Sequence, residues 1–285
     1  MSRPRTVGLL AVACLSLFAL PAGDALAQQP PVNLGTAGSF GVLAGSTVTN
    51  TGPTTINGDL GLSPGTSVTG FPPGKVNGTI HVANAVAAQA QSDLTTAYND
   101  AAGRLPANSV SGDLGGSTLA PGVYKSGSSL GLTGTVTLDA GGNADAVFIF
   151  QVASSLTTAS GSRVALVNGA RPCNVFWQIG SSATLGTSTV FVGNILALTS
   201  ITLNNGASLS GRALARNGAV TLDNNTVTAA NCAAASAPTG VPAREPAPTG
   251  GATTGGHKPM FGSLGWQELT IILVIVIIIL SLIHI

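Results

Sequence analysis

The 285 residues include 38 glycines, with only 7% charged and 4% aromatic side chains and a formal net charge of +1. This neutral balance gives no electrostatic reason to bind nucleic acid or another strongly anionic partner. The 44% hydrophobic residues fall in short alternating runs, which favours a packed β core over a disordered chain.

The N-terminus has the parts of a secretory signal peptide. Arg3 and Arg5 precede an apolar run over residues 7–20, and Ala25-Leu26-Ala27 supplies the small residues that a signal peptidase reads. We therefore expect residues 1–27 to be removed and the protein to be secreted or held in the cell envelope.

Short strands separated by Gly, Pro and Asn are predicted from residue 32 onward. A pattern of an aliphatic residue, a small polar residue, Gly, any residue and another aliphatic residue recurs in both halves of the chain. A Gly after a small polar residue suits a bend, or a close approach of backbones in stacked coils. The copies are residues 56–60, 76–80, 110–114, 132–136 and, more loosely, 209–213.

One helical pattern interrupts these strands. Residues 82–104 are Ala-rich, and their apolar positions recur every three or four residues. Gly103 and Pro106 end the pattern. At 1.5 Å per residue such a helix is about 33 Å long, enough to lie along about seven stacked strands. We expect it to cover one flank of the β structure.

Five triplets between residues 128 and 228 place a Thr between aliphatic or small residues. The steps between the central threonines are 20, 27, 18 and 19 residues, about the length of one coil of a β-solenoid with short strands on three sides. We expect these threonines to stack as a column, with small residues two positions earlier pointing the same way. The candidate face consists of Thr135, Thr137, Ser155, Thr157, Ser182, Thr184, Ser200, Thr202 and Thr221.

A second candidate face lies six or seven residues further along each coil. We expect Arg163 and Phe191 to interrupt it, which leaves the first face as the more regular one. Threonine is β-branched and stiff, so a flat array of its methyl and hydroxyl groups can order water or dock to a crystal. The alternative is that Thr is abundant only because it favours strands. The hydroxyl residues of the second face are Thr189, Ser208, Thr226 and Thr228.

Two runs are the most hydrophobic of the predicted strands, 146–150 and 175–179. Their aromatic side chains, among them Phe150 and Trp177, are expected in the core or against the helix. Stacking of Trp177 on a ligand is the less favoured alternative, since a single aromatic residue in an apolar run usually packs.

Catalytic and metal-binding patterns are missing from the sequence. The histidines are isolated, without metal-ligand spacing. The aspartates are spread one to a coil beside Gly or Asn, where they stabilise turns. A carbohydrate-active solenoid enzyme needs carboxylates clustered on one face, and Asp139 and Asp223 occupy the same predicted coil position but lie several coils apart. We expect no enzymatic activity, no metal and no cofactor.

Two cysteines remain after removal of the signal peptide, Cys173 and Cys232. The even count and the oxidising compartment favour a disulfide between them over two isolated buried thiols.

The composition changes after Cys232. Residues 233–259 are rich in Ala, Pro, Thr and Gly and are typical of a flexible linker. Residues 260–285 are hydrophobic, with an apolar run from 269 to 283 that is short for a bilayer span of about 20 residues. The start of this segment resembles the opening of the small subunit of the twin-arginine translocase. It is either a membrane anchor or the product of a fusion at a gene boundary.

The domain between these segments, residues 28–232, resembles the microbial ice-binding-like domain family. The motifs include Pro121-Gly122-Val123-Tyr124 and are numerous and in order. The segments that carry the resemblance are 33–45, 89–104, 121–124, 146–151, 174–178 and 211–215.

This resemblance implies a fold dominated by β-strands, namely a discontinuous right-handed three-sided β-solenoid (β-helix) with one long α-helix alongside. It also implies that the first and last strands lie near each other. The implied function is that of an exported, monomeric protein that adsorbs to ice through a flat Thr, Ser and Ala-rich face and limits ice growth or recrystallisation. The alternative is a non-catalytic cell-surface adhesion or structural module without ice activity, held at the membrane by residues 260–285.

Overall fold

A computed structural model describes residues 28–230 of the chain. The predicted signal peptide (1–27), linker (233–259) and hydrophobic segment (260–285) lie outside the described residues, as does Cys232.

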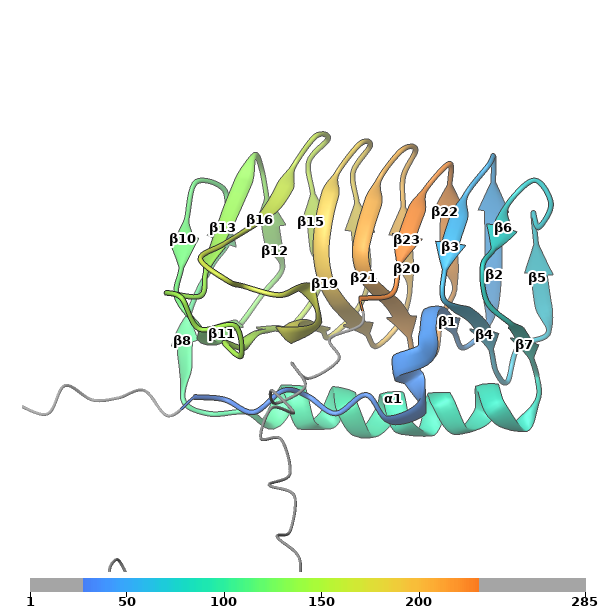
Figure 1. Ribbon diagram of the computed structural model, residues 1–285, viewed down its shortest axis with the longest axis horizontal. Coiled ribbons are helices and arrows are strands. Elements are labelled where there is room, and N and C mark those ends of the chain that lie inside the picture. The colour runs from blue at the N-terminus through green and yellow to red at the C-terminus, as the bar shows by residue number, and fades with distance from the viewer. Residues whose placement is uncertain (1–27, 231–285) are drawn as a thin grey trace, which may run out of the picture. The chain divides into compact units, whose positions relative to one another are not determined.

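The fold is mostly parallel β-sheet with one long helix (Figure 1). Successive coils of the chain stack on one another, so that each strand pairs in parallel with the strand one coil away. The prediction of a β-dominated fold with one helix alongside is therefore confirmed.

The first ladder of strands is an eight-stranded sheet. We call its outward side the Thr face. Its strands are short and pair in unbroken order from one end of the stack to the other. In spatial order they are β5 (Ser67–Thr69), β2 (Thr47–Thr51), β22 (Val220–Asp223), β20 (Ile201–Leu203), β18 (Ala183–Leu185), β15 (Leu156–Thr158), β12 (Leu130–Leu132) and β9 (Gly112–Asp113).

The second ladder belongs to the 15-stranded sheet, and its outward side is called the second face. Here β16 and β19 are joined by a single residue pair, Arg163 with Val190, so the ladder is weakest at that step. Its strands are β6 (Lys75–Val76), β3 (Thr55–Asn57), β23 (Thr226–Thr228), the first halves of β21 (Ser208–Ala215) and β19 (Val190–Ala197), β16 (Arg163–Val167), β13 (Thr135–Asp139) and β10 (Thr118–Leu119).

The third ladder faces the helix and is continuous with the second, because β19 and β21 bend from one to the other. They bend at Gly193 and Gly211, which are paired and have φ of 112° and 153°. A Cβ on Gly211 would lie 2.0 Å from the Gly193 carbonyl oxygen, so neither a side chain nor an ordinary backbone conformation fits there. The other strands are β8 (Ala107–Ser109), β11 (Gly122–Ser126), β14 (Phe148–Val152), β17 (Val175–Ile179), β1 (Phe40–Ala44), β4 (Asp59–Leu62) and β7 (Ile80–Val82).

The order of coils in space is not their order in the sequence. The N-terminal strands β1, β2 and β3 pair with β21, β22 and β23 near the end of the described chain. Figure 1 shows these blue strands beside the orange ones. After β7, helix α1 (Ala85–Gly103) carries the chain along the stack to β8 at the opposite end. The expectation that the first and last strands lie near each other is confirmed.

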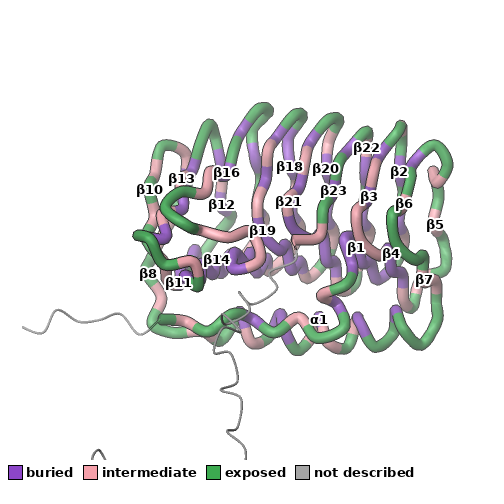
Figure 2. Tube along the Cα trace, viewed as in Figure 1, coloured by how far each residue is buried: buried purple, intermediate pink, exposed green. Residues whose placement is uncertain are grey.

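Helix α1 packs on the third ladder through one stripe of small and apolar residues (Figure 2). The Asn84 side chain caps the helix by accepting a hydrogen bond from the Ala87 N–H at 3.0 Å. Leu94 is fully buried against strand residues such as Phe176. Val86, which the predicted helical pattern includes among its apolar positions, is 47% exposed, so its place in the buried stripe is wrong. At 19 residues the helix is about 29 Å long. Within residues 28–230 there is no helix apolar and long enough to span a bilayer.

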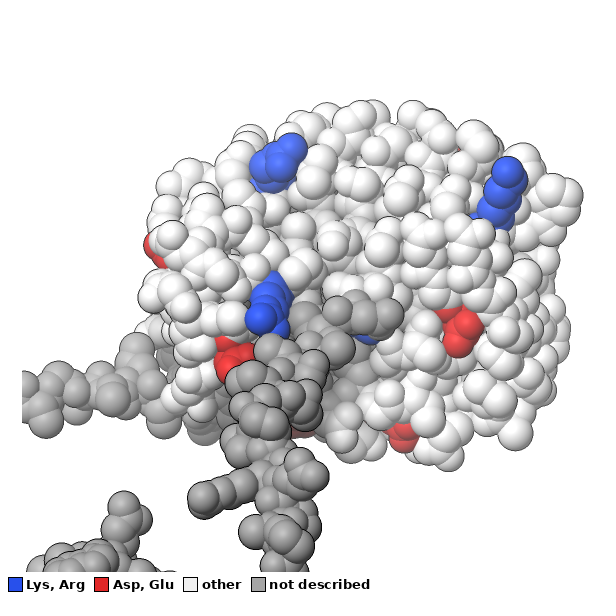
Figure 3. Space-filling model, in the orientation of Figure 1, with Lys and Arg blue, Asp and Glu red and all other residues white. Residues whose placement is uncertain are grey.

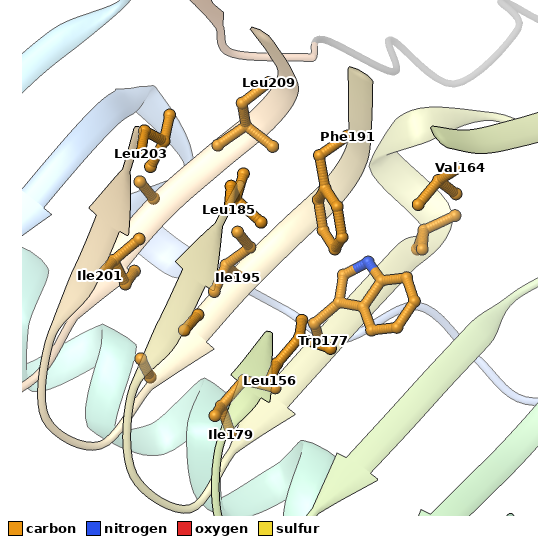
Figure 4. Packing of buried hydrophobic residues seen from close by; sticks show 14 of the residues in the cluster. Leu156, Val164, Trp177, Ile179, Leu185, Phe191, Ile195, Ile201, Leu203 and Leu209 are labelled. Carbon is orange, nitrogen blue, oxygen red and sulfur yellow. The ribbon is translucent and has the colours of Figure 1, made fainter. Parts of the chain in front are cut away.

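The interior of the stack contains a row of aromatic rings, of which Figure 4 shows Trp177 and Phe191 among aliphatic side chains. Phe150 lies 3.9 Å from Trp177, ring centroid to centroid and nearly parallel. Tyr124 stacks on the other side of Phe150, and Phe191 lies against Trp177 with its ring tilted by 48°. Trp177 is fully buried, and its indole N–H donates to the Val192 carbonyl at 3.0 Å. The core assignment of Phe150 and Trp177 is confirmed, and ligand stacking by Trp177 is wrong.

The helix contact can be tested by Leu94→Ala. Removing this fully buried side chain leaves a cavity between α1 and the strands, which costs about 2–5 kcal/mol of unfolding free energy. The exposed Val86→Ala on the same helix is the control and should change stability by less than about 0.5 kcal/mol. Equal losses in urea denaturation would contradict the packing described here.

Candidate functional site

Over six consecutive coils of the Thr face, threonine occupies the same outward position in the register of the strands. Register pairs join each of them to the next without a shift. Parallel strands lie about 4.8 Å apart, so the column extends over about 24 Å. In spatial order the residues are Thr69, Thr49, Thr221, Thr202, Thr184 and Thr157.

Five of these six threonines are oriented by buried residues on either side of them, whereas Thr69 on the edge strand β5 has half-buried neighbours. Thr202, for example, lies between Ile201 and Leu203, both fully buried, so strand alternation turns its side chain outward. Thr49, Thr69, Thr157 and Thr221 are exposed and the other two are half-buried. Within residues 28–230 none of the six hydroxyls forms a hydrogen bond, so they are available to water or to a solid surface.

A second column of small residues runs beside the threonines, two positions earlier in each coil. Backbone hydrogen bonds stack Ser155, Ser182, Ser200 and Ala219 coil by coil. The Ser182 and Ser200 hydroxyls accept hydrogen bonds from the backbone N–H groups of Ser200 and Ala219, at 3.3 and 3.2 Å. The hydroxyls of these two serines therefore stabilise the backbone at the edge of the face, whereas the hydroxyls of the six threonines form no hydrogen bond within residues 28–230. Thr47 and Ser67 continue this column.

The structure corrects two of the predicted face residues. Thr135 and Thr137 lie on β13 of the second face, in register with Arg163 and Ala165. In their coil the Thr-face strand is Leu130–Leu132, and Gly131 occupies the threonine position opposite Thr157. The same correction separates Asp139, at the end of β13, from Asp223, at the end of β22. These two carboxylates do not share a coil position.

The N-terminal members of the column, Thr49 and Thr69, were not predicted. Their strands read Thr-Val-Thr and Ser-Val-Thr, an alternation of outward hydroxyl and inward aliphatic residues that indicates a strand. They lack the aliphatic residue after the threonine that defines the other triplets. Their place in the column also depends on β2 pairing with β22, far away in sequence.

The second face is less regular than the Thr face. One column passes through Thr135, Arg163, Val190, Ser208, Thr226, Thr55 and Lys75 in register.

Two cations and an aliphatic residue therefore interrupt the hydroxyls of that column. A hollow of about 260 Å³ lies between β19, β21 and β23. In Figure 3 the charged side chains on this side of the molecule are few and scattered. Ser208, Thr226 and Thr228 lie on the second face as predicted, and Arg163 interrupts it.

Two other predictions for this face are wrong because the strand begins one residue later than expected. Phe191 points inward and is fully buried beside Trp177, whereas Val190 points outward. Thr189 is also fully buried, in the corner between the Thr face and the second face. Its hydroxyl contacts the Thr158 hydroxyl at 2.8 Å and donates to the Ala159 carbonyl at 3.2 Å. Thr189 is therefore a structural residue.

Asp113 and Asp139 stabilise turns. The Asp113 carboxylate accepts the Gly115 N–H at 2.7 Å, and the Asp139 carboxylate accepts the Gly141 N–H at 2.8 Å. Hydrogen bonds, chiefly from Thr133 in one case and from Gly141 in the other, hold the pKa of Asp113 and of Asp139 below the usual value. Among residues 28–230 no three His, Cys, Asp or Glu side chains converge to hold a metal ion.

Cys173 is disulfide-bonded. Its expected partner, Cys232, lies outside the described residues, so that pairing stays a prediction. Cys173 lines a hollow of about 790 Å³ together with Ala230, the last described residue.

Comparison with known proteins gives consistent results. Residues 42–228 match the family described as ice-binding-like. The chain is 57% identical over 221 residues to an ice-binding protein of Nostoc sp. (strain HG1), covering 77% of this chain and 80% of that protein. It is 37% identical over 225 residues to an ice-binding protein of Colwellia sp., covering 73% and 88%. The crystal structure of an ice binding protein from an Antarctic biological consortium superposes with a TM-score of 0.70 at 56% identity, covering 70% of this chain and 92% of that chain.

The structural role of Thr189 can be tested by Thr189→Val. The change keeps the shape of the side chain but leaves the buried Thr158 hydroxyl without one partner, so we expect a loss of about 1–2 kcal/mol in unfolding free energy. The exposed Thr226→Val on the second face should stay within about 0.5 kcal/mol of wild type. Thermal unfolding followed by circular dichroism distinguishes the two, and equal stability of both variants would show that Thr189 is not buried in the corner.

Proposed function

Since this chain belongs to the ice-binding-like family, we propose that it adsorbs to ice through the Thr face and thereby limits the growth or recrystallisation of ice crystals. The relatives compared above carry the name ice-binding protein, which supports the proposal. The observation on which it depends is the column of six in-register threonines, with hydroxyls that form no hydrogen bond within residues 28–230.

The geometry of the Thr face suits a repeating solid. Along the stack, equivalent atoms recur at the strand spacing of about 4.8 Å, and along a strand the outward positions recur at about 6.8 Å. Threonine has few rotamers, so the array loses little side-chain entropy on contact. Methyl groups shape the water between the columns, and hydroxyls hydrogen-bond it. The face therefore matches a lattice of ordered water molecules over many contacts at once.

Limitation of crystal growth follows from tight adsorption. Ice that grows between bound protein molecules must bulge outward, and a curved front melts at a lower temperature than a flat one. No bond is made or broken, so the proposal needs neither catalytic residues nor a cofactor. The proposal also takes the protein to be a monomer in which the coils form a right-handed, three-sided solenoid. Such a solenoid is a rigid prism, and one of its flat sides, the Thr face, contacts the ice.

The second candidate function is attachment at the cell envelope. It is favoured by the place where the described chain ends. The Ala229 N–H donates to the Asn57 carbonyl on β3, and Ala230 lies beside Gly38 and Phe176, where the second face meets the helix side. The last described residue thus lies away from the Thr face. Export by residues 1–27 and anchoring by residues 260–285 are proposals that are compatible with ice adsorption.

Replacement of single threonines of the Thr face by tyrosine tests the proposed function. Thr157→Tyr, Thr184→Tyr and Thr202→Tyr each place a bulky ring on the flat surface and hold ice away from its neighbours. We expect each to raise the protein concentration needed to arrest recrystallisation by about ten-fold or more, equivalent to about 1.4 kcal/mol of adsorption free energy.

Thr226→Tyr is the matched control, since it places the same ring on the second face at an exposed strand position. Its activity should equal that of wild type. If Thr226→Tyr abolishes the arrest of recrystallisation and Thr202→Tyr does not, the adsorbing surface is the second face. If all variants behave alike, neither face adsorbs.

Anchoring is tested by deletion of residues 260–285 in the source organism. The proposal expects the full-length protein to sediment with membranes and the truncated protein to appear in the medium. The same distribution of both forms would reject the anchor, whatever the ice activity of the domain.

A further inference from the structure

The threonine column stops before the end of the stack. Two more coils follow Thr157 in the eight-stranded sheet, and the positions in register with the threonines are Gly131 on β12 and Asp113 on β9. At the other end the column continues to the edge strand β5, where Thr69 is exposed. The face is thus complete at one end and incomplete at the other.

Hydrogen bonds hold the Asp113 carboxylate next to Gly131, which has no side chain, on the adjacent strand β12. One carboxylate oxygen accepts the backbone N–H groups of Thr133 and Gly115, at 2.9 and 2.7 Å, and the other accepts the Thr133 hydroxyl at 2.7 Å. These bonds direct the carboxylate toward β12. A Cβ on Gly131 would lie 3.0 Å from the second of these oxygens. A side chain at residue 131 therefore crowds the Asp113 carboxylate, which must shift by a few tenths of an ångström to make room for it.

The carboxylate also carries a charge that is not neutralised locally. Asp113 is exposed, and the single salt bridge among residues 28–230 joins Arg104 to Asp100. An ionised carboxylate binds its own hydration water strongly, and removing that water is costly. Hydration water arranged around a charge does not match the repeat of hydroxyl and methyl groups further along the face.

We propose that Asp113, together with Gly131, sets the end of the ice-adsorbing surface and confines adsorption to the six coils between Thr157 and Thr69. The inference rests on the proposed function and deepens it. It gives Asp113 a role in limiting the surface, apart from its role in the turn. It also predicts that adsorption can be strengthened, since two coils of correct geometry lie unused beside the column.

The test is a gain of activity. Asp113→Asn keeps an oxygen that accepts the N–H groups of Thr133 and Gly115 but removes the charge. Asp113→Thr combined with Gly131→Thr extends the column to eight coils, and the hydroxyl at residue 113 replaces part of the turn hydrogen bonding. We expect each to lower the concentration that arrests recrystallisation by about two- to three-fold, since adsorption grows with the matched area.

Gly131→Thr alone should bring no gain, because its Cβ meets the Asp113 carboxylate. The double variant should therefore exceed the sum of Asp113→Thr and Gly131→Thr measured singly, which is the signature of direct coupling. Asp139→Asn is the matched control, since Asp139 holds a similar turn away from the Thr face. Its activity should equal that of wild type. Unfolding temperatures of all variants separate a change in the surface from a change in folding.

The outcomes distinguish the two proposals. If Thr202→Tyr abolishes activity while Asp113→Asn and the folded double variant match wild type, the Thr face adsorbs ice and the role given to Asp113 is wrong. If Asp139→Asn gains as much as Asp113→Asn, the effect is one of net charge and the boundary is again wrong. A wild-type protein without ice activity would overturn both proposals.

Discussion

The parallel register between stacked coils is the constraint on which the rest of this structure depends. Because every coil places a short strand directly beside the equivalent strand of the next, one outward residue per coil becomes a column, and one inward residue becomes a layer of the core. Thr202 falls between Thr184 and Thr221 for the same reason that Ile201 falls between Ala183 and Val220. A slip by one residue would bury the threonines and expose the aliphatic side chains. The packing of the core and the flatness of the Thr face therefore both depend on the same register between coils.

The helix and the exchanged order of coils complete the same stack. Helix α1 covers the ladder that would otherwise expose residues such as Phe176, and it returns the chain to the far end of the stack. Its length of 19 residues is what allows the N-terminal coils to pair with the C-terminal ones. As a consequence the Thr face draws its column from both ends of the sequence. The chain leaves the last strand, β23, beside β3, on the side away from that face.

Much of this arrangement could be predicted from local patterns, and the exceptions have a common cause. Thr157, Thr184, Thr202 and Thr221 were placed correctly because their coils follow one another in sequence and share one triplet. Thr137 was misplaced because its coil has Gly131, not a threonine, at the Thr-face position. The Val-Thr-Leu triplet around Thr137 lies on the second face instead. Thr49 and Thr69 were missed because non-sequential stacking leaves no trace in residue spacing. Thr189 and Phe191 were misassigned by one position, which in a strand exchanges the inside for the outside. The sequence alone therefore predicted which segments form strands, but it did not predict the register in which the strands of different coils pair.

The central claim is that the Thr face, and no other side of the prism, contacts ice. The most direct measurement is the partition of fluorescently labelled protein into a slowly grown ice hemisphere, with wild type, Thr202→Tyr and Thr226→Tyr compared at equal concentration. The account predicts that wild type and Thr226→Tyr enter the ice together, while Thr202→Tyr remains in the liquid. Entry of Thr202→Tyr into the ice to the same extent as wild type would contradict it.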